Sequence, residues 1–141
     1  MKKLKNKILI SLLIAFCIIS SVSLCMPVKA NSEIGTSGSV KSSATTTFSF
    51  YNTCTLSYGV TGYFMDVQVS ATASNNNNET ITLEVYIVNR GVTKTYTFYS
   101  NNGTYTYNNI FLGFSGGSPV AFKFTGANPA IQLTVTLKFT S

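Results

Sequence analysis

The stretch TITLEVYIVNRGVTKTYTFY, residues 80–99, decides the fold of this chain. Apolar and polar side chains alternate over residues 80–87 and again over residues 92–99, which is the period of a β-strand with one buried face. The core-facing positions predicted from this alternation are Ile81, Leu83, Val85, Ile87, Tyr96 and Phe98. The stretch therefore predicts two antiparallel strands joined by a turn around Arg90.

The loop between these strands must contain an even number of residues, because odd positions of the first strand face the core together with even positions of the second. Either residues 90–91 form a two-residue turn or residues 89–92 form a four-residue loop. We favour the longer loop, since arginine disfavours the positive φ of a tight hairpin turn. Both loops predict the pairs Leu83 with Phe98 and Val85 with Tyr96.

Asn102-Gly103 is the strongest short hairpin signal in the chain. It predicts that the strand before this turn pairs with the strand after it. The predicted pairs are Phe98 with Tyr107 and Ser100 with Tyr105. Tyr105 and Tyr107 are then core-facing.

The remaining alternations predict more short strands separated by turn residues. Asn52 interrupts the apolar row of residues 45–58, which predicts a bulge or a change of sheet there. The apolar phase changes from odd to even positions at Asn108-Asn109, which predicts a second bulge or kink. Further strands are predicted over residues 65–73, 120–124 and 131–139, and the core-facing residues after the second bulge are Ile110, Leu112 and Phe114.

Seven or eight antiparallel strands with short connections predict an all-β fold. The class expected is an antiparallel two-sheet β-sandwich, immunoglobulin-like or jelly-roll, over residues 44–141. The alternation leaves the strand order within each sheet open.

The first 30 residues predict a secretory signal peptide. Four lysines precede an apolar run, and Val28-Lys29-Ala30 places small residues at the positions that a cut after Ala30 requires. The alternative, a retained membrane anchor, is weakened by Pro27 and the serines near it. Lipidation at Cys25 is disfavoured because Leu24 stands where a small residue is needed. Residues 31–43 predict a flexible lead-in, and the protein is expected to be bacterial, secreted and extracellular.

Charge and residue types exclude most enzyme classes. After the leader, five basic and four acidic side chains remain, scattered singly, so no basic patch for nucleic acid is expected. The chain has no histidine, which removes the usual nucleophile pairs and zinc sites. Asp66 and Glu84 are the only carboxylates that a shared cleft could bring together. We expect no catalytic residue, no metal and no cofactor.

Cys54 is the cysteine that remains once Cys17 and Cys25 leave with the leader. It shares the even, apolar face of its strand with Phe50 and Leu56, which predicts a buried, unreactive thiol. An intermolecular disulfide is the alternative.

Tyr86 and Tyr99 fall on the polar faces of their strands and are the candidate ligand-binding residues. Their neighbours on that face are Thr82, Glu84, Thr95 and Thr97. The predicted register separates the two tyrosines by four positions, about 13 Å. A tyrosine has an apolar ring and a polar tip, which suits stacking against a sugar.

The function expected is that of a secreted, non-enzymatic structural or interaction protein. Because its strands carry few charges, we expect homotypic assembly or contact with the cell envelope. A carbohydrate-binding module is the alternative, and a pore-forming or bacteriocin-like toxin is the third. The expected partners are the protein itself or cell-envelope polysaccharide, with no nucleic acid and no stable transmembrane segment after cleavage.

Overall fold

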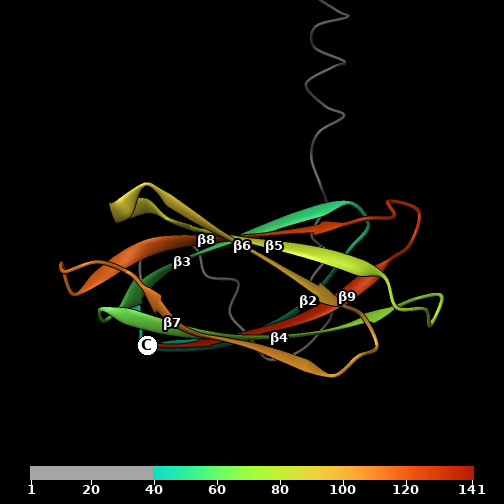
Figure 1. Cartoon of the computed structure of the whole chain (residues 1–141), viewed down its shortest axis with the longest axis horizontal. Coiled ribbons are helices and arrows are strands. Elements are labelled where there is room, and N and C mark those ends of the chain that lie inside the picture. Colours follow the sequence, from blue (N-terminus) through green and yellow to red (C-terminus); the bar gives the residue numbers. More distant parts are fainter. Residues whose placement is uncertain (1–39) are drawn as a thin grey trace, which may run out of the picture.

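The computed structural model describes residues 40–141, which form strands in two layers (Figure 1). The predicted signal peptide, residues 1–30, and residues 31–39 lie outside the described residues. The strands are β1 Val40–Lys41, β2 Ser43–Phe50, β3 Thr53–Thr61, β4 Phe64–Ala73, β5 Thr80–Ile87, β6 Val92–Tyr99, β7 Thr104–Phe111, β8 Gly117–Gly126 and β9 Leu133–Thr140. Strand β1 lies ahead of the predicted domain start at Ala44 and pairs in parallel with β3.

The strands build a five-stranded sheet, β1-β3-β8-β5-β6, and a four-stranded sheet, β2-β9-β4-β7. All neighbours except β1 and β3 are antiparallel. From β2 onward, successive strands alternate between the two sheets, and only β5 and β6 follow one another within one sheet. This interleaving is a jelly roll. It confirms the predicted two-sheet β-sandwich, and of the two predicted kinds, immunoglobulin-like and jelly-roll, it is the jelly roll.

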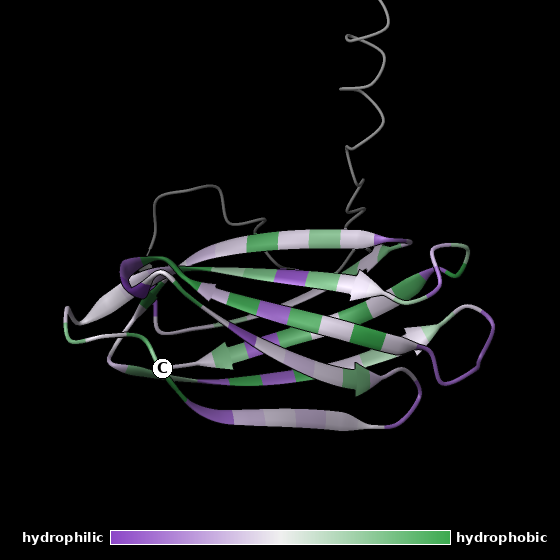
Figure 2. Ribbon diagram, turned by 45° about the horizontal axis from the view of Figure 1, so that its top comes forward, coloured by the Kyte–Doolittle hydropathy of each residue, from purple (hydrophilic) through white to green (hydrophobic). Residues whose placement is uncertain are grey.

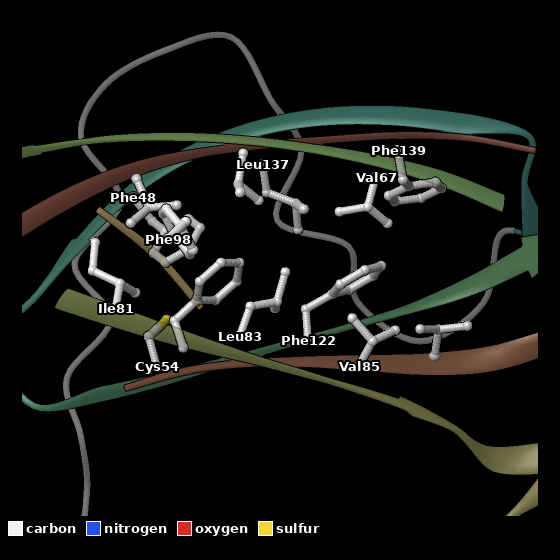
Figure 3. Packing of buried hydrophobic residues seen from close by; sticks show 14 of the residues in the cluster. Phe48, Cys54, Val67, Ile81, Leu83, Val85, Phe98, Phe122, Leu137 and Phe139 are labelled. Carbon is white, nitrogen blue, oxygen red and sulfur yellow. The ribbon is translucent and has the colours of Figure 1, made fainter. Parts of the chain in front are cut away.

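Hydrophobic and hydrophilic residues alternate along the strands (Figure 2), and the buried apolar side chains form one core cluster between the two sheets. Phenylalanine rings from both sheets meet there (Figure 3). The ring of Phe124 on β8 lies 5.1 Å from that of Phe48 on β2, and Phe122 lies 5.8 Å from Phe139 on β9. Burying each such ring stabilises the fold by about 2 to 3 kcal/mol. The inter-sheet contacts are therefore the main source of stability.

The corner at Asn52 explains the interrupted apolar row of the first strands. Strand β2 belongs to the four-stranded sheet and β3 to the five-stranded sheet, so the predicted change of sheet is confirmed. Cys54, just beyond the corner, is buried at 1% exposed, as predicted. It is disulfide-bonded, so the prediction of an unreactive thiol is wrong.

Strands β5 and β6 pair in a different register from the predicted one. The observed pairs are Ile81 with Phe98, Leu83 with Tyr96 and Val85 with Lys94, so the predicted pairs Leu83 with Phe98 and Val85 with Tyr96 are wrong. The loop contains an even number of residues, as predicted, but it begins one residue earlier. Val88 leaves the strand for a short 3₁₀ turn, Val88–Arg90. The face of each residue is unchanged, because this slip preserves the pairing of odd with even positions.

The predicted hairpin at Asn102-Gly103 is wrong, because β6 and β7 belong to different sheets. At this corner Asn101 has a φ of 57°, and its N–H donates to the carbonyl oxygen of Ala71 on β4 at 2.8 Å. The chain therefore crosses to the other sheet, where β7 pairs with β4. The predicted pairs Phe98 with Tyr107 and Ser100 with Tyr105 do not form.

Tyr96 and Tyr107 join the two sheets along the edge formed by β6 and β7. Their ring centroids lie 4.0 Å apart, and the Tyr107 hydroxyl donates to the Thr97 carbonyl at 3.3 Å. Burial raises the pKa of both phenols, and the neighbouring Tyr105 raises the pKa of Tyr107 further. Tyr105 and Tyr107 both pack against the core, so their predicted inward orientation is confirmed.

The predicted bulge at Asn108-Asn109 is confirmed. The pairing of β4 with β7 shifts between Met65 and Val67, which leaves both asparagines opposite Asp66. Asn109 has a φ of 57°, and its N–H donates to Asp66 Oδ1 at 2.8 Å. The additional residue moves the inward positions of β7 from odd to even numbers.

Candidate functional site

Tyr86 on β5 and Tyr99 on β6 lie on the outer face of the five-stranded sheet, with 41% and 43% of their surfaces exposed. Tyr86 pairs with Thr93, and Tyr99 pairs with Thr80. Six register positions therefore separate the two tyrosines, which is about 20 Å along the strands. The predicted spacing of about 13 Å is wrong because of the slip in register between β5 and β6.

Threonine hydroxyls and one ion pair cover the sheet between the two tyrosines. One row across the sheet contains Thr97, Thr82, Thr125 and Thr53, and the next contains Thr95, Glu84, Lys123 and Thr55. Lys123 Nζ donates to Glu84 Oε2 at 2.7 Å, so the two charges offset each other. We call the surface formed by Tyr86, Tyr99 and these two rows the tyrosine face.

The tyrosine face has groups for stacking and for hydrogen bonding. Each exposed phenol ring offers an apolar surface, and the threonines between the rings offer hydroxyls that both donate and accept. The sequence predicts these residues because strict alternation determines which side chains face water. The distance between Tyr86 and Tyr99 could not be predicted from the sequence, because it depends on the register of β5 with β6, and that register depends on where the loop between them begins.

Carboxylates do not gather at this face. Glu84 is paired with Lys123, whereas Asp66 belongs to β4 in the other sheet, so the structure does not bring the two together. Within residues 40–141, no group of three or more His, Cys, Asp or Glu side chains is placed to hold a metal ion. In the same part of the chain, no helix has the length and hydropathy needed to cross a membrane.

The outer face of the four-stranded sheet has hydroxyl rows of a different kind. The hydroxyls of Thr47 and Thr136 hydrogen-bond to each other at 2.9 Å, and those of Ser49 and Thr134 at 2.7 Å. A shallow hollow of about 390 Å³ borders these pairs, lined by Ser70, Ala71, Thr72, Asn101, Gly103, Thr104, Thr134 and Thr136. No aromatic ring lines the hollow, so it lacks a stacking surface.

A second aromatic surface lies at one end of the sandwich. Phe64 and Phe111 pair across β4 and β7 with ring centroids 5.2 Å apart, and Phe114 lies 4.8 Å from Phe111. The guanidinium of Arg90 stands 4.8 Å from the centroid of the Phe111 ring. We call these four residues the end cluster.

Phe114 departs from its predicted position. The even phase of Ile110 and Leu112 predicts that it faces the core, yet 87% of its surface is exposed. Gly113 has a φ of +122°, which a side chain disfavours, and it ends the alternation and turns the chain outward. A glycine directly after Leu112 is the one sequence signal for this change. The other residues of the end cluster, Phe64, Phe111 and Arg90, come from segments far apart in sequence. The alternation of apolar and polar residues therefore could not predict that they lie together.

Comparisons with known proteins assign no family. No protein-family model matches the chain, and no curated protein matches it. The carbohydrate-binding module CBM36, solved with calcium and xylotriose, is 18% identical with a TM-score of 0.48 and covers 78% of this chain and 94% of its own. The CBM36-1 domain of a multidomain xylanase from the hindgut metagenome of Trinervitermes trinervoides is 20% identical with a TM-score of 0.47, covering 67% and 77%.

A third similar structure is a periplasmic inhibitor of g-type lysozyme from Aeromonas hydrophila. It is 13% identical, has a TM-score of 0.42, and covers 70% of this chain and 84% of its own. Because these TM-scores lie below 0.5 and the identities do not exceed 20%, none of the three likenesses assigns a function to the chain. What the structure defines is a class, a jelly-roll β-sandwich with exposed aromatic side chains on one sheet face and at one end.

Proposed function

We propose that the protein is a non-catalytic module that binds polysaccharide chains on the tyrosine face. The observation that carries the proposal is the pair of exposed rings, Tyr86 and Tyr99, on one sheet face about 20 Å apart. A sugar ring has an apolar face that stacks on an aromatic ring and hydroxyls that bond to polar neighbours. Two rings at this spacing, with hydroxyls between them, suit a chain of several sugars.

The charge of the tyrosine face favours a neutral chain. Lys123 and Glu84 are half-exposed and bound to each other, so the surface between the rings presents no unbalanced charge. The rest of the intervening surface consists of threonine hydroxyls. We further propose that the leader over residues 1–30 exports the module and that cell-envelope polysaccharide is its ligand.

Replacing both Tyr86 and Tyr99 by alanine is expected to lower retention on insoluble polysaccharide at least tenfold. Each ring contributes about 1 kcal/mol through stacking and burial, which is about fivefold in affinity. The measurement is a set of depletion isotherms on cellulose, chitin, xylan and peptidoglycan. Tyr51→Ala is the matched control, because Tyr51 is 55% exposed but lies at the corner between β2 and β3. Unchanged retention of the double variant, or no retention of the wild type on any of the four, contradicts the proposal.

Self-association is a second candidate function, favoured by one observation about β2. This strand is at an edge of the four-stranded sheet, and its sequence SATTTFSF contains no charged residue, glycine or proline. Edge strands usually carry such residues, which discourage pairing with another chain. Two copies that paired through β2 would form one continuous sheet.

Thr45→Lys is expected to abolish this association, because Thr45 is exposed on β2 and lysine at an edge blocks strand addition. Sedimentation velocity over a hundredfold concentration range measures it. The wild type is expected to form larger species as concentration rises, and Thr45→Lys to stay monomeric. Thr140→Lys is the control, since Thr140 is exposed on the interior strand β9. A wild type that remains monomeric throughout eliminates this candidate.

A further inference from the structure

Exposed apolar side chains gather at the end of the sandwich that carries the end cluster. Of the seven large hydrophobic side chains exposed in the described part of the chain, four lie there: Tyr63, Phe64, Val88 and Phe114. Three connections meet at this end. The N–H of Leu112 donates to the Tyr63 carbonyl at 2.7 Å, and Arg90 Nη1 donates to the Phe111 carbonyl at 3.1 Å. Apolar surface concentrated in this way marks an interaction site rather than chance exposure.

The end cluster is ordered by its own contacts. Phe111 lies between Phe64 at 5.2 Å and Phe114 at 4.8 Å, and Arg90 covers it at 4.8 Å. A ligand that covers these rings therefore gains apolar burial without first having to order them. Because Phe114 is 87% exposed, its ring adds little to the stability of the fold.

The shape and chemistry of the end cluster point to a flat apolar phase rather than a sugar. Phe114 projects from a loop, so its ring is presented outward rather than enclosed by neighbours. The cluster rings are phenyl groups without hydroxyl tips, unlike the tyrosines of the tyrosine face. Tyr63, which is 54% exposed beside them, is the type of residue that lies at the level of lipid headgroups.

The cation in direct contact with the end cluster favours an anionic surface. Arg90 supplies a cation directly at the rings. Asp66, two residues beyond Phe64 on β4, has its Oδ1 bound to the N–H of Asn109 at 2.8 Å. We propose that this end of the sandwich docks on an anionic lipid bilayer, with the Phe114 ring inserted below the headgroups and Arg90 against them. The contact is peripheral and separate from the tyrosine face.

A single tryptophan tests the insertion directly, because the chain contains none. Phe114→Trp is expected to shift its fluorescence emission to shorter wavelength when vesicles of phosphatidylcholine and phosphatidylglycerol are added. Tyr51→Trp reports on an exposed aromatic position outside the cluster and is expected to show no shift. No shift for Phe114→Trp, or equal shifts at both positions, overturns the proposal.

Vesicle sedimentation tests the same contact without a reporter. Phe114→Ala is expected to weaken partitioning at least tenfold, the loss expected for one fully buried ring. Arg90→Gln is expected to weaken it about fivefold on vesicles with phosphatidylglycerol and not on pure phosphatidylcholine. The Tyr86→Ala and Tyr99→Ala double variant is expected to partition like the wild type, which keeps this test separate from polysaccharide binding.

Three other outcomes overturn the proposal. Wild-type protein that stays in the supernatant with both lipids rules out a bilayer contact. Equal partitioning of Phe114→Ala and Tyr51→Ala assigns the contact to another surface. A dimer that Phe114→Ala dissociates, in the absence of any vesicle binding, identifies a second copy of the chain as the occupant.

Discussion

Phe124→Ala is expected to lower the free energy of unfolding by about 4 kcal/mol, the largest effect expected in this fold. Phe124 is fully buried. Its ring lies 5.1 Å from Phe48 and 6.4 Å from Phe50, both on β2 of the opposite sheet, and 6.4 Å from Phe98 on β6. The substitution therefore removes contacts within one sheet and between the two, and it leaves a cavity that rigid strands cannot close.

Urea unfolding followed by circular dichroism measures this loss, and Phe114→Ala is its control. Both variants remove the same atoms from a phenylalanine, but Phe114 is 87% exposed, so its loss is expected to stay within about 0.5 kcal/mol. Similar losses for the two variants are incompatible with a core centred on Phe124. The comparison also shows whether Phe114→Ala is folded stably enough for use in the vesicle experiments.

Which face each strand presents to the core could be predicted, and the register could not. Alternation assigned Ile81, Leu83 and Val85 inward, and all three are buried. The observed and predicted registers both pair odd with even positions, so burial alone does not distinguish them. The position where β5 ends decides the register. Val88 is a residue type common in strands, so the sequence suggests that β5 includes it. In the structure it is instead the first residue of the 3₁₀ turn.

The local sequence also does not determine which of the two sheets each strand joins. Asn102-Gly103 signals a reversal of the chain, and a reversal is what the structure contains. Whether the returning strand pairs with its predecessor or crosses to the other sheet depends on a distant bond, from the Asn101 N–H to the Ala71 carbonyl. In a jelly roll most reversals are crossings of this kind.

The tyrosine face and the end cluster differ in how much of each could be predicted from the sequence. Tyr86 and Tyr99 are on strands with regular alternation, so their exposure follows from position alone. The end cluster combines β4, the β5–β6 turn and the segment from β7 to β8. Its composition depends on the folding of the whole chain, and the decisive change of direction occurs at Gly113, where the alternation ends.

Gly117→Ala is expected to lower the free energy of unfolding by about 3 kcal/mol, the second-largest effect expected in this fold. A Cβ at Gly117 would stand 2.7 Å from the carbonyl oxygen of Val60 and 3.4 Å from the Cα of Thr61. Both atoms belong to the backbone of β3, with which β8 pairs along its length. Because no side-chain rotation relieves the clash, the two strands must separate where β8 begins.

The matched control is Gly103→Ala, where a Cβ meets no atom within 4 Å but the φ of +82° is unfavourable for a side chain. That variant is expected to lose only about 1 kcal/mol, from backbone strain. Equal losses for the two glycines would mean that β3 and β8 are not packed as closely as described. Asn89 Nδ2 donates to the Gly117 carbonyl at 2.9 Å, so displacement of β8 also moves the turn that carries Arg90. Gly117→Ala is therefore expected to weaken vesicle binding as well, whereas Gly103→Ala, in the β6–β7 connection, is expected to leave it unchanged.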